Sequence, residues 1–270
     1  MFRHAIFSQH GLGQRKIGVE NTPKILSNHM VRYINKHYIR NYDNFNQNLK
    51  ALYNCNKNID GKRINIGGDH SMTIATGAYS LNKYNNTKFI WIDAHADINN
   101  MESSNTGNIH GMPLGFLTSH GKTNAFPFIN NKLRYDNLIY IGLRDMDDYE
   151  SKLIYKYNIP VIRSSEANNN TKMVCDILKK MCADSPVHIS FDVDALDPRV
   201  IFSTGTPVSK GLRQNTATKI IKYLNENLDV INMDVCELNL NIGSDKQTKM
   251  SLSNTLNILA PLKIFIPMRN

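Results

Sequence analysis

Three potential metal ligands follow a buried apolar run at alternate positions. The stretch FIWIDAHADINN begins with apolar residues and then presents Asp93, His95 and Asp97. Residues i, i+2 and i+4 of a strand share one face, so these side chains can converge on one point as the strand opens into a loop. The stretch HISFDVDALDP repeats the pattern with Asp192 and Asp194. The spacing therefore predicts a cation site at the ends of two strands.

A histidine follows a third apolar run. The stretch NIGGDHS places His70 just past two glycines, which permit a close approach of the backbone. Taken alone, His70 or Asp97 is more typical of a helix cap or a surface residue, and Asp197, which precedes a proline, is typical of a turn. Four acids at the ends of buried strands, however, would repel one another and lose their hydration unless cations neutralised them. Two such strands favour a metal site over coincidence.

The charge of this cluster favours two divalent cations. The four aspartates carry four negative charges, which two dications would balance. Metal ions about 3.5–4 Å apart can lower the pKa of a shared water molecule and provide a hydroxide for attack on an electrophilic carbon. Most donors are oxygen atoms, with two histidines and no cysteine, and this set favours manganese, with zinc, cobalt and iron as alternatives. The pattern is typical of a two-metal hydrolytic site.

The elements that must position these residues alternate between strand and helix. Short apolar, β-branched runs suit strands buried on both faces; they are RINIGG (63–68), KFIWIDAH (88–95), NLIYIGLR (137–144), IPVIR (159–163), VHISFDVD (187–194) and VINMDVCEL (230–238). Helical spacing occurs in PKILSNHMVRYINKHY (23–38), SMTIATGAYSLNKY (71–84), TKMVCDILKKMC (171–182), QNTATKIIKYLNEN (214–227) and near 248–259. Residues 100–132 are expected to form a loop. We predict a single α/β domain over residues 1–270, with a mainly parallel sheet covered by helices on both faces.

Charge and composition bound the possible partners. The net charge of +9 raises the possibility of a nucleic-acid or acidic-membrane partner. The lysines are scattered singly, however, and no RNP-like aromatic motif accompanies them, so a solvated basic surface is favoured. The N-terminus lacks the apolar core of a secretion signal, and no stretch approaches the roughly 20 apolar residues of a membrane span. We therefore expect a cytoplasmic protein without a nucleic-acid or membrane partner.

The four cysteines show no metal-binding or disulfide pattern. Cys55, Cys175, Cys182 and Cys236 lack CxxC spacing, and Cys175 and Cys182 lie two turns apart on one predicted helix. We expect all four to be reduced and structural.

Seven motifs along the chain resemble those of the ureohydrolases, and within them the arginases. They occur in family order as GGDHS (67–71), DAHADIN (93–99), GNIHGMP (107–113), GLRDMD (142–147), SFDVDALDP (190–198), GTPV (205–208) and MDVCEL (233–238). The segment GQRKIGVENTPKIL (13–26) is similar to the opening segment of the family. The resemblance covers nearly the whole chain and implies a three-layer α/β/α arginase-type fold with a mainly parallel eight-stranded sheet.

The resemblance implies two Mn²⁺ ions per subunit and a ligand set for each. The first ion would bind His70, Asp93, Asp97 and Asp192, and the second His95, Asp93, Asp192 and Asp194, so that Asp93 and Asp192 bridge. Among these ligands, Asp97 is also assigned to the catalytic group.

The resemblance also assigns residues to the substrate. His110 matches a histidine that passes a proton to the leaving amine, and Glu237 matches the acid that binds the guanidinium and completes the catalytic set. Carboxylates suit the planar fork of guanidinium donors. The resemblance places Asp147 at the α-amino group of the substrate and Asn99 and Thr106 at its α-carboxylate, with Asp145 and Glu150 nearby.

The implied reaction is hydrolysis of L-arginine to L-ornithine and urea by attack of metal-bound hydroxide. Other ureohydrolases acting on agmatine, guanidinobutyrate or formiminoglutamate are the alternatives, followed by a catalytically idle binding protein. Asn99 and the GNIHG context favour arginase. The stretch NNMESSNTGN departs from the family, because Thr106 replaces the usual serine and Glu102 adds a charge, and LNLNIG lacks the usual proline.

The end of the chain bears on assembly. It reads APLKIFIPMRN, without the longer tail that often ties subunits of the family into trimers. The resemblance therefore leaves a homo-oligomer open, through other surfaces, without implying a trimer.

Overall fold

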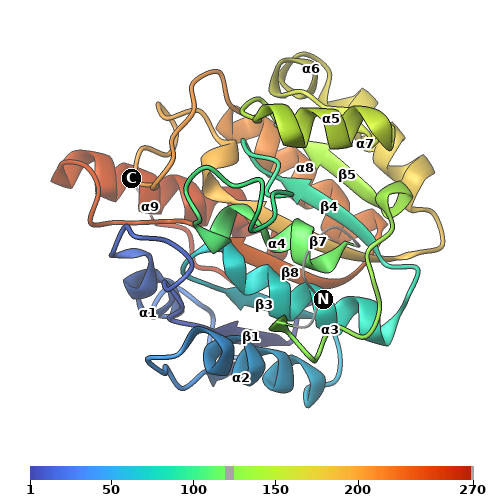
Figure 1. The fold of residues 1–270 in the computed structure, drawn as a ribbon. Helices are drawn as coiled ribbons and strands as arrows, with labels where there is room; N and C mark the ends of the chain where they lie inside the picture. Colours follow the sequence, from blue (N-terminus) through green and yellow to red (C-terminus); the bar gives the residue numbers. More distant parts are fainter. Residues whose placement is uncertain (119–124, 269–270) are drawn as a thin grey trace.

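The computed structural model describes residues 1–118 and 125–268 and has one eight-stranded sheet at its centre (Figure 1). Every pair of neighbouring strands is parallel. The strands, in the spatial order β2-β1-β3-β8-β7-β4-β5-β6, are β1 (His4–Phe7), β2 (Asn35–Tyr38), β3 (Arg63–Ile66), β4 (Lys88–Ile92), β5 (Leu138–Ile141), β6 (Val161–Ile162), β7 (Pro186–Asp192) and β8 (Asp229–Cys236).

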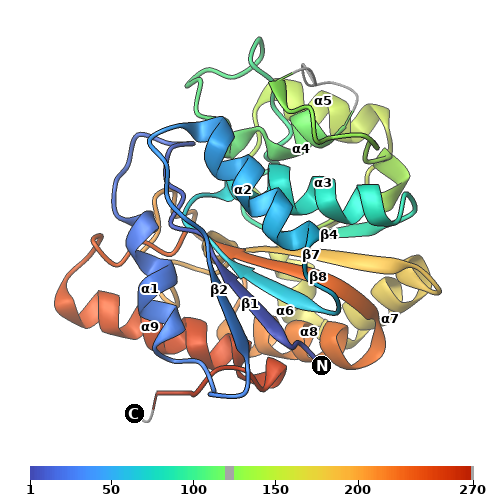
Figure 2. The same ribbon diagram turned by 90° about the horizontal axis from the view of Figure 1, so that it is seen from below.

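Helices cover both faces of the sheet, which makes three layers (Figure 2). One face carries α2 (Phe45–Lys57), α3 (Thr73–Lys83), α4 (Pro113–Leu117) and α5 (Asp148–Lys156). The other carries α1 (Thr22–Ser27), α6 (Ser164–Asn169), α7 (Thr171–Cys182), α8 (Gln214–Asn227) and α9 (Asp245–Leu259). Short 3-10 helices lie between these elements at η1 (Val19–Asn21), η2 (His70–Met72), η3 (Ile109–Gly111), η5 (Tyr135–Asn137), η6 (Val193–Ala195) and η7 (Ala260–Leu262).

Two apolar cores, one on each face, fix the position of the central strands. In β4, Phe89 and Trp91 pack into the core with α2 to α5, whereas Ile90 and Ile92 pack into the core with α7 to α9. All four side chains are buried. Burial on both faces explains why the run reads as continuously apolar in the sequence. The strand is therefore held rigidly where its carboxyl end reaches the site.

The structure confirms the six predicted strands as β3 to β8, together with the parallel three-layer fold. It adds β1 and β2, which the sequence patterns did not predict. The single helix predicted over 23–38 is wrong, because α1 ends at Ser27 and residues 35–38 form the edge strand β2. Parallel pairing of β2 with β1 outweighs the local helical spacing.

The order of the strands brings the site residues together. Strands β3, β8, β7 and β4 are consecutive neighbours in the sheet, and all four run in the same direction. Their carboxyl ends therefore meet at one edge, where ligands gather in open α/β sheets. The segment 100–132, predicted as loop, contains η3 and α4, and its residues 119–124 lie outside the described residues.

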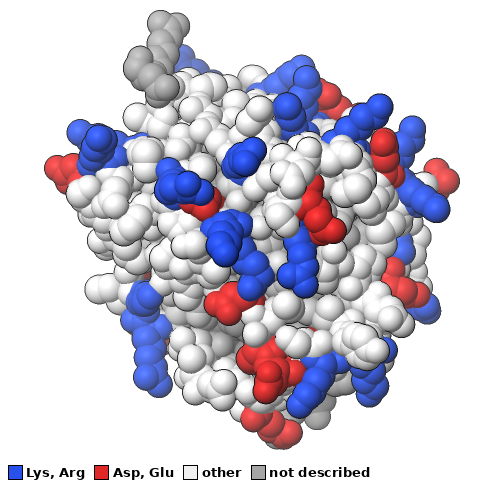
Figure 3. Space-filling model, turned by 90° about the horizontal axis from the view of Figure 1, so that it is seen from above, with Lys and Arg blue, Asp and Glu red and all other residues white. Residues whose placement is uncertain are grey.

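Charged side chains are mixed on the surface. On the face drawn in Figure 3, Lys and Arg side chains are spread out and interspersed with Asp and Glu. Within residues 1–118 and 125–268, none of the helices combines the length and the apolar character that a membrane crossing requires.

Candidate metal centre and active site

His70 lies at the centre of a buried ring of carboxylates. Its Nδ1 atom is 2.9 Å from Asp97 Oδ2, 3.1 Å from Asp93 Oδ2 and 3.2 Å from Asp192 Oδ2. Despite this proximity, Nδ1 has no hydrogen-bond partner among the described residues. A buried nitrogen that is aimed at three acids without a hydrogen bond fits a metal ligand. The structure brings together the four residues predicted for the first ion.

His95 forms a second ring beside the first. Its Nδ1 atom is 3.0 Å from Asp194 Oδ2 and 3.5 Å from Asp93 Oδ1, so Asp93 faces both histidines. Asp192 faces His70, and its Oδ1 accepts a hydrogen bond from the backbone N–H of Asp194 at 2.8 Å. Both rings hold three potential ligand atoms within 4.8 Å of one another. The donors fit two adjacent dications, and the six predicted ligand residues all lie here.

Neighbouring residues contact the two histidines and Asp93. His70 Nε2 lies 2.7 Å from Ser190 Oγ, and its ring stacks on Trp91 with centroids 4.2 Å apart. The Trp91 indole N–H donates to Asp93 Oδ2 at 3.0 Å. His95 Nε2 lies 3.7 Å from a carboxylate oxygen of Asp145. Outer partners of this kind fix the ring orientation of metal-binding histidines.

Close packing of the backbone holds the turn that carries His70. A Cβ atom at Gly68 would lie 1.8 Å from the carbonyl oxygen of His10, which no side chain could tolerate. The carbonyl of Gly68 also accepts the backbone N–H of Glu237 at 2.8 Å. The prediction that glycine here permits a close backbone approach is therefore confirmed.

Two site residues adopt a backbone conformation that L-amino acids rarely take. Asp97 has φ 49° and Glu237 has φ 64°. The carbonyl oxygen of Asp97 accepts the backbone N–H of Leu114 at 3.0 Å, which ties the turn to α4. Left-handed conformations of non-glycine residues cluster at functional sites, where the surrounding structure compensates the strain.

The carboxylates change the protonation of their neighbours. Burial alone would lower the pKa of His95, but Asp194 and Asp93 outweigh it and raise that pKa to about 12. Burial and the charge of Asp93 raise the pKa of Asp97 to about 6. Burial, with the charges of Asp194 and Asp93, raises the pKa of Asp192 well above its ordinary value. Without metal, the cluster therefore gathers protons in place of cations, and metal binding must release them.

Glu237 is buried and fully engaged beside the metal cluster. Its Oε1 accepts the backbone N–H of His70 at 2.8 Å and lies 3.1 Å from His110 Nδ1. Its Oε2 accepts the side-chain amide of Gln14 at 2.8 Å. The structure therefore brings Glu237 and His110 together, with Glu237 behind His110 rather than on the cavity wall.

The pKa of His110 reports this contact. Burial alone would lower that pKa, but the hydrogen bond and charge of Glu237 raise it to about 9. In metal-free protein we expect a His110 NMR resonance that titrates near pH 9 and shifts toward 6.5 or below in Glu237→Gln. The folded pKa exceeds the unfolded one, so the stability that this pair contributes is present below pH 6.5 and is lost as the pH rises through 9. An unchanged titration in the variant would contradict the assigned cause.

A cavity of about 290 Å³ opens in front of the metal cluster. Its wall includes the predicted ligands His95, Asp97, Asp192 and Asp194, with His110, and also the predicted substrate residues Asn99, Thr106, Asp145, Asp147 and Glu150. Within the described chain, Glu102 is not part of this wall. The predicted substrate residues therefore share one cavity with the predicted metal ligands.

Asp147 and Glu150, which are predicted to lie near the amino-acid end of the substrate, also cap α5. Asp147 Oδ1 accepts the backbone N–H of Glu150 at 2.9 Å, and Glu150 Oε2 accepts that of Asp147 at 3.2 Å. Asp147 Oδ2 accepts the side-chain amide of Asn99 at 2.8 Å. Burial raises the pKa of Glu150 to about 7. Glu150 therefore has a structural role in capping, while Asp147 keeps Asn99 oriented toward the cavity.

Sequence reasoning did not predict several residues of the site. Ser190 precedes Asp192 by two positions on β7, so the strand alternation could have identified it. Gln14 offers no such signal, because 223 positions separate it from Glu237. Cys236 was expected to be structural, yet its sulfur lies within 4.8 Å of ligand atoms of His70 and Asp192.

Together, the fold and the site define a hydrolase of the ureohydrolase class. Its potential metal ligands cluster at the carboxyl ends of the strands of a parallel sheet in a three-layer fold. The pattern of the Arginase family matches residues 12–259. An arginase of Staphylococcus aureus is 35% identical over 218 residues, which cover 78% of this chain and 72% of that protein. The chain belongs to the arginase family.

Solved structures agree with this assignment. An arginase of Entamoeba histolytica, in complex with L-ornithine, superimposes with a TM-score of 0.86 at 27% identity and covers 97% of this chain and 98% of its own. An arginase of Bacillus subtilis gives a TM-score of 0.84 at 27% identity, covering 96% and 98%. The eight-stranded fold expected from the resemblance is thus confirmed.

Proposed function

We propose that this protein hydrolyses the guanidinium group of L-arginine to L-ornithine and urea with two Mn²⁺ ions. The observation that carries the proposal is the cavity, which joins the double carboxylate–histidine ring to polar residues suited to an amino acid. Two dications, when bound, would supply a hydroxide nucleophile at neutral pH. The protein's own residues provide the rest of the chemistry.

His70, His95 and the four aspartates would hold the ions. The mainly oxygen donor set favours Mn²⁺. The hydrogen bonds of Trp91 to Asp93 and of Ser190 to His70 orient these donors before any ion binds, which lowers the cost of organising the site. A relative with an idle site would need no such buried cluster of acids, whose desolvation is costly.

Glu237 would bind the guanidinium, and His110 would protonate the leaving amine. A buried carboxylate suits two parallel N–H donors. His110 lies on the cavity wall and is held protonated by Glu237, so its proton is positioned for the departing nitrogen. When the guanidinium takes over the contact that Glu237 makes to His110, His110 would be released with its proton, ready to pass it to the leaving amine.

Asp147 would bind the α-amino group of arginine, an amine that agmatine also has and guanidinobutyrate lacks. In Asp147→Ser, serine keeps the helix cap but removes the carboxylate. We expect kcat/KM for arginine to fall about 10- to 100-fold, because a hydrogen bond to a charged group contributes about 1.5–3 kcal/mol. Agmatine keeps the amine, so its hydrolysis should fall by a similar factor, whereas hydrolysis of guanidinobutyrate, which lacks the amine, should be unchanged.

The matched control is Asp148→Ser, which removes an exposed acid next in the chain. Urea release from arginine, agmatine and guanidinobutyrate, and formamide release from formiminoglutamate, are measured side by side with manganese-loaded protein. Preferential hydrolysis of agmatine, guanidinobutyrate or formiminoglutamate by the unmodified protein would replace arginine in the proposal. If the protein bound its metal ions but hydrolysed none of these compounds, the result would support the alternative of a catalytically idle binding protein.

A further inference from the structure

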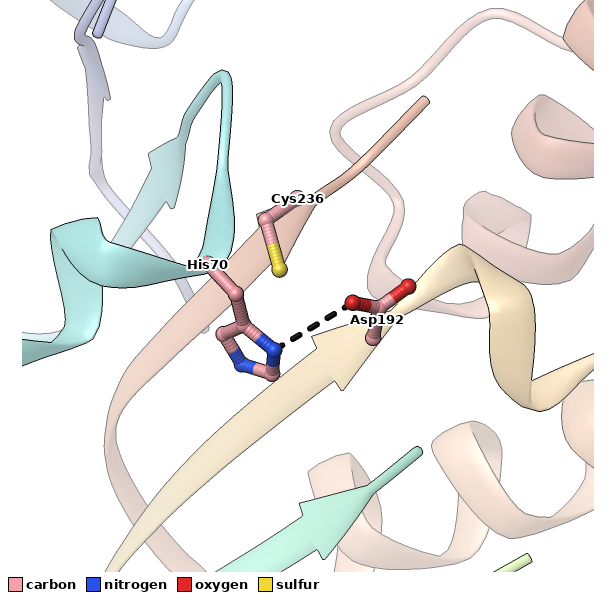
Figure 4. A group of neighbouring side chains, drawn as sticks. All are labelled: His70, Asp192 and Cys236. Carbon is pink, nitrogen blue, oxygen red and sulfur yellow. Dashed lines mark ion pairs between the residues drawn. The ribbon is translucent and has the colours of Figure 1, made fainter. Parts of the chain in front are cut away.

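A cysteine lies at the edge of the ring around His70. Cys236 ends β8, and its Sγ atom, the Nδ1 atom of His70 and a carboxylate oxygen of Asp192 all lie within 4.8 Å of one another. Figure 4 shows the sulfur pointing into the space between the His70 ring and the Asp192 carboxylate. All three side chains are at least 97% buried.

The simplest alternative is that Cys236 only fills the core. It does pack with the apolar cluster on the α3 face, and its thiol points to the carbonyl of Phe191 at 3.7 Å, a weak contact. A core-filling role of Cys236 does not explain the surroundings of the neighbouring His70 nitrogen. Nδ1 of His70 is buried and lacks a hydrogen-bond partner among the described residues, although it is surrounded by donors suited to a metal.

The second ring differs in composition. His95, Asp93 and Asp194 form a group without sulfur in the described chain. One metal position is therefore surrounded by oxygen and nitrogen donors alone, and the other has a thiol within reach. Soft sulfur ligands favour zinc and other thiophilic ions, whereas carboxylates suit manganese.

We propose that Cys236 is an additional ligand of the His70 metal position and makes that position favour Zn²⁺ or Co²⁺ over Mn²⁺, relative to the His95 position. The inference rests on the metal-dependent function proposed above. On coordination the S–H bond breaks, the sulfur keeps the electron pair and donates it to the ion, and the proton passes to solvent. The oxidation states of sulfur and metal do not change.

The test uses the full chain, stripped of metal and loaded with Zn²⁺ or Co²⁺ alone. X-ray absorption of the zinc protein should show a Zn–S distance of about 2.3 Å, and the cobalt protein should show sulfur-to-cobalt charge-transfer absorption. Both signals should vanish in Cys236→Val and in Cys236→Ser. Cys182→Val is the matched control, because Cys182 is also buried but lies at the end of α7 on the other face of the sheet.

Competition between ions gives a second measurement. After dialysis against equal concentrations of Mn²⁺ and Zn²⁺, the zinc-to-manganese ratio bound by wild type and Cys182→Val should exceed that of the Cys236 variants by about 10-fold or more, in line with losses of metal affinity on removing supporting groups. Zinc bound only by nitrogen and oxygen in wild type, or equal ratios in all four proteins, would overturn the proposal. Urea release decides the proposed function separately, since either result can accompany active or inactive enzyme.

Discussion

Asp192→Asn should lose at least one of the two metal ions and, with it, measurable hydrolysis of arginine. Asp192 Oδ2 faces His70, and Asp192 is assigned to bridge both ions, so the change removes one anionic donor from each position. The loss of metal affinity should exceed the roughly 10- to 100-fold that follows removal of an outer partner. Bound manganese is counted by elemental analysis after dialysis, and urea release is measured on the same samples.

Metal-free protein should respond in the opposite direction. Burial and two like charges raise the folded pKa of Asp192 above its unfolded value, so its ionisation destabilises the metal-free fold increasingly as the pH rises above that unfolded pKa. Asparagine removes this charge and keeps an oxygen for the Asp194 N–H. Metal-free Asp192→Asn should therefore unfold at a higher temperature than metal-free wild type, and each kcal/mol corresponds to about 2–4 °C.

Added manganese should reverse this order, because an ion that binds only the folded state stabilises it in proportion to its affinity. Asp197→Asn is the matched control. It makes the same chemical change five positions later, where the carboxylate pairs with Arg199 at 2.7 Å outside the metal rings. Undiminished metal content in Asp192→Asn, or equal metal loss in Asp197→Asn, would contradict the bridging assignment.

The sequence predicted the centre of this site better than its surroundings. Strands β4 and β7 are buried on both faces and carry acids at alternate positions at or just past their ends, so burial and spacing together predicted the metal ligands. The edge strand β2 is a polar run, partly exposed, and has no such signal. Its strand conformation comes from pairing with β1, which is a tertiary contact.

Contacts across long sequence distances explain the missed site residues. Gln14 meets Glu237 because the N-terminal segment packs against the turn after β3, where the backbone N–H of Asp69 donates to the carbonyl of His10. Cys236 did carry a signal, since it directly precedes the predicted guanidinium acid at the end of an apolar strand. A lone cysteine without CxxC spacing, however, is usually structural, and only the position of its sulfur beside His70 separates the two interpretations.

Glu237→Gln should abolish productive binding of the guanidinium while leaving the metal ions in place. Removing one partner of a buried, hydrogen-bonded charge pair costs about 2–5 kcal/mol. We therefore expect kcat/KM for arginine to fall on the order of 10²- to 10³-fold. Glutamine has the same shape and can still accept the backbone N–H of His70, so the turn that carries this metal ligand should survive.

Three measurements separate this role from a structural one. Metal content should match wild type, whereas kcat/KM falls and the pKa of His110 shifts from about 9 toward 6.5 or below. Gln14→Leu serves as the companion variant, because it removes the neutral hydrogen bond to Oε2 and keeps the charge. Its loss in kcat/KM should be about 10-fold or less, as a neutral hydrogen bond contributes about 0.5–1.5 kcal/mol. If Glu237→Gln released the metals, or if Gln14→Leu impaired hydrolysis equally, the carboxylate would be a scaffold of the His70 turn, and its charge would not be what binds the substrate.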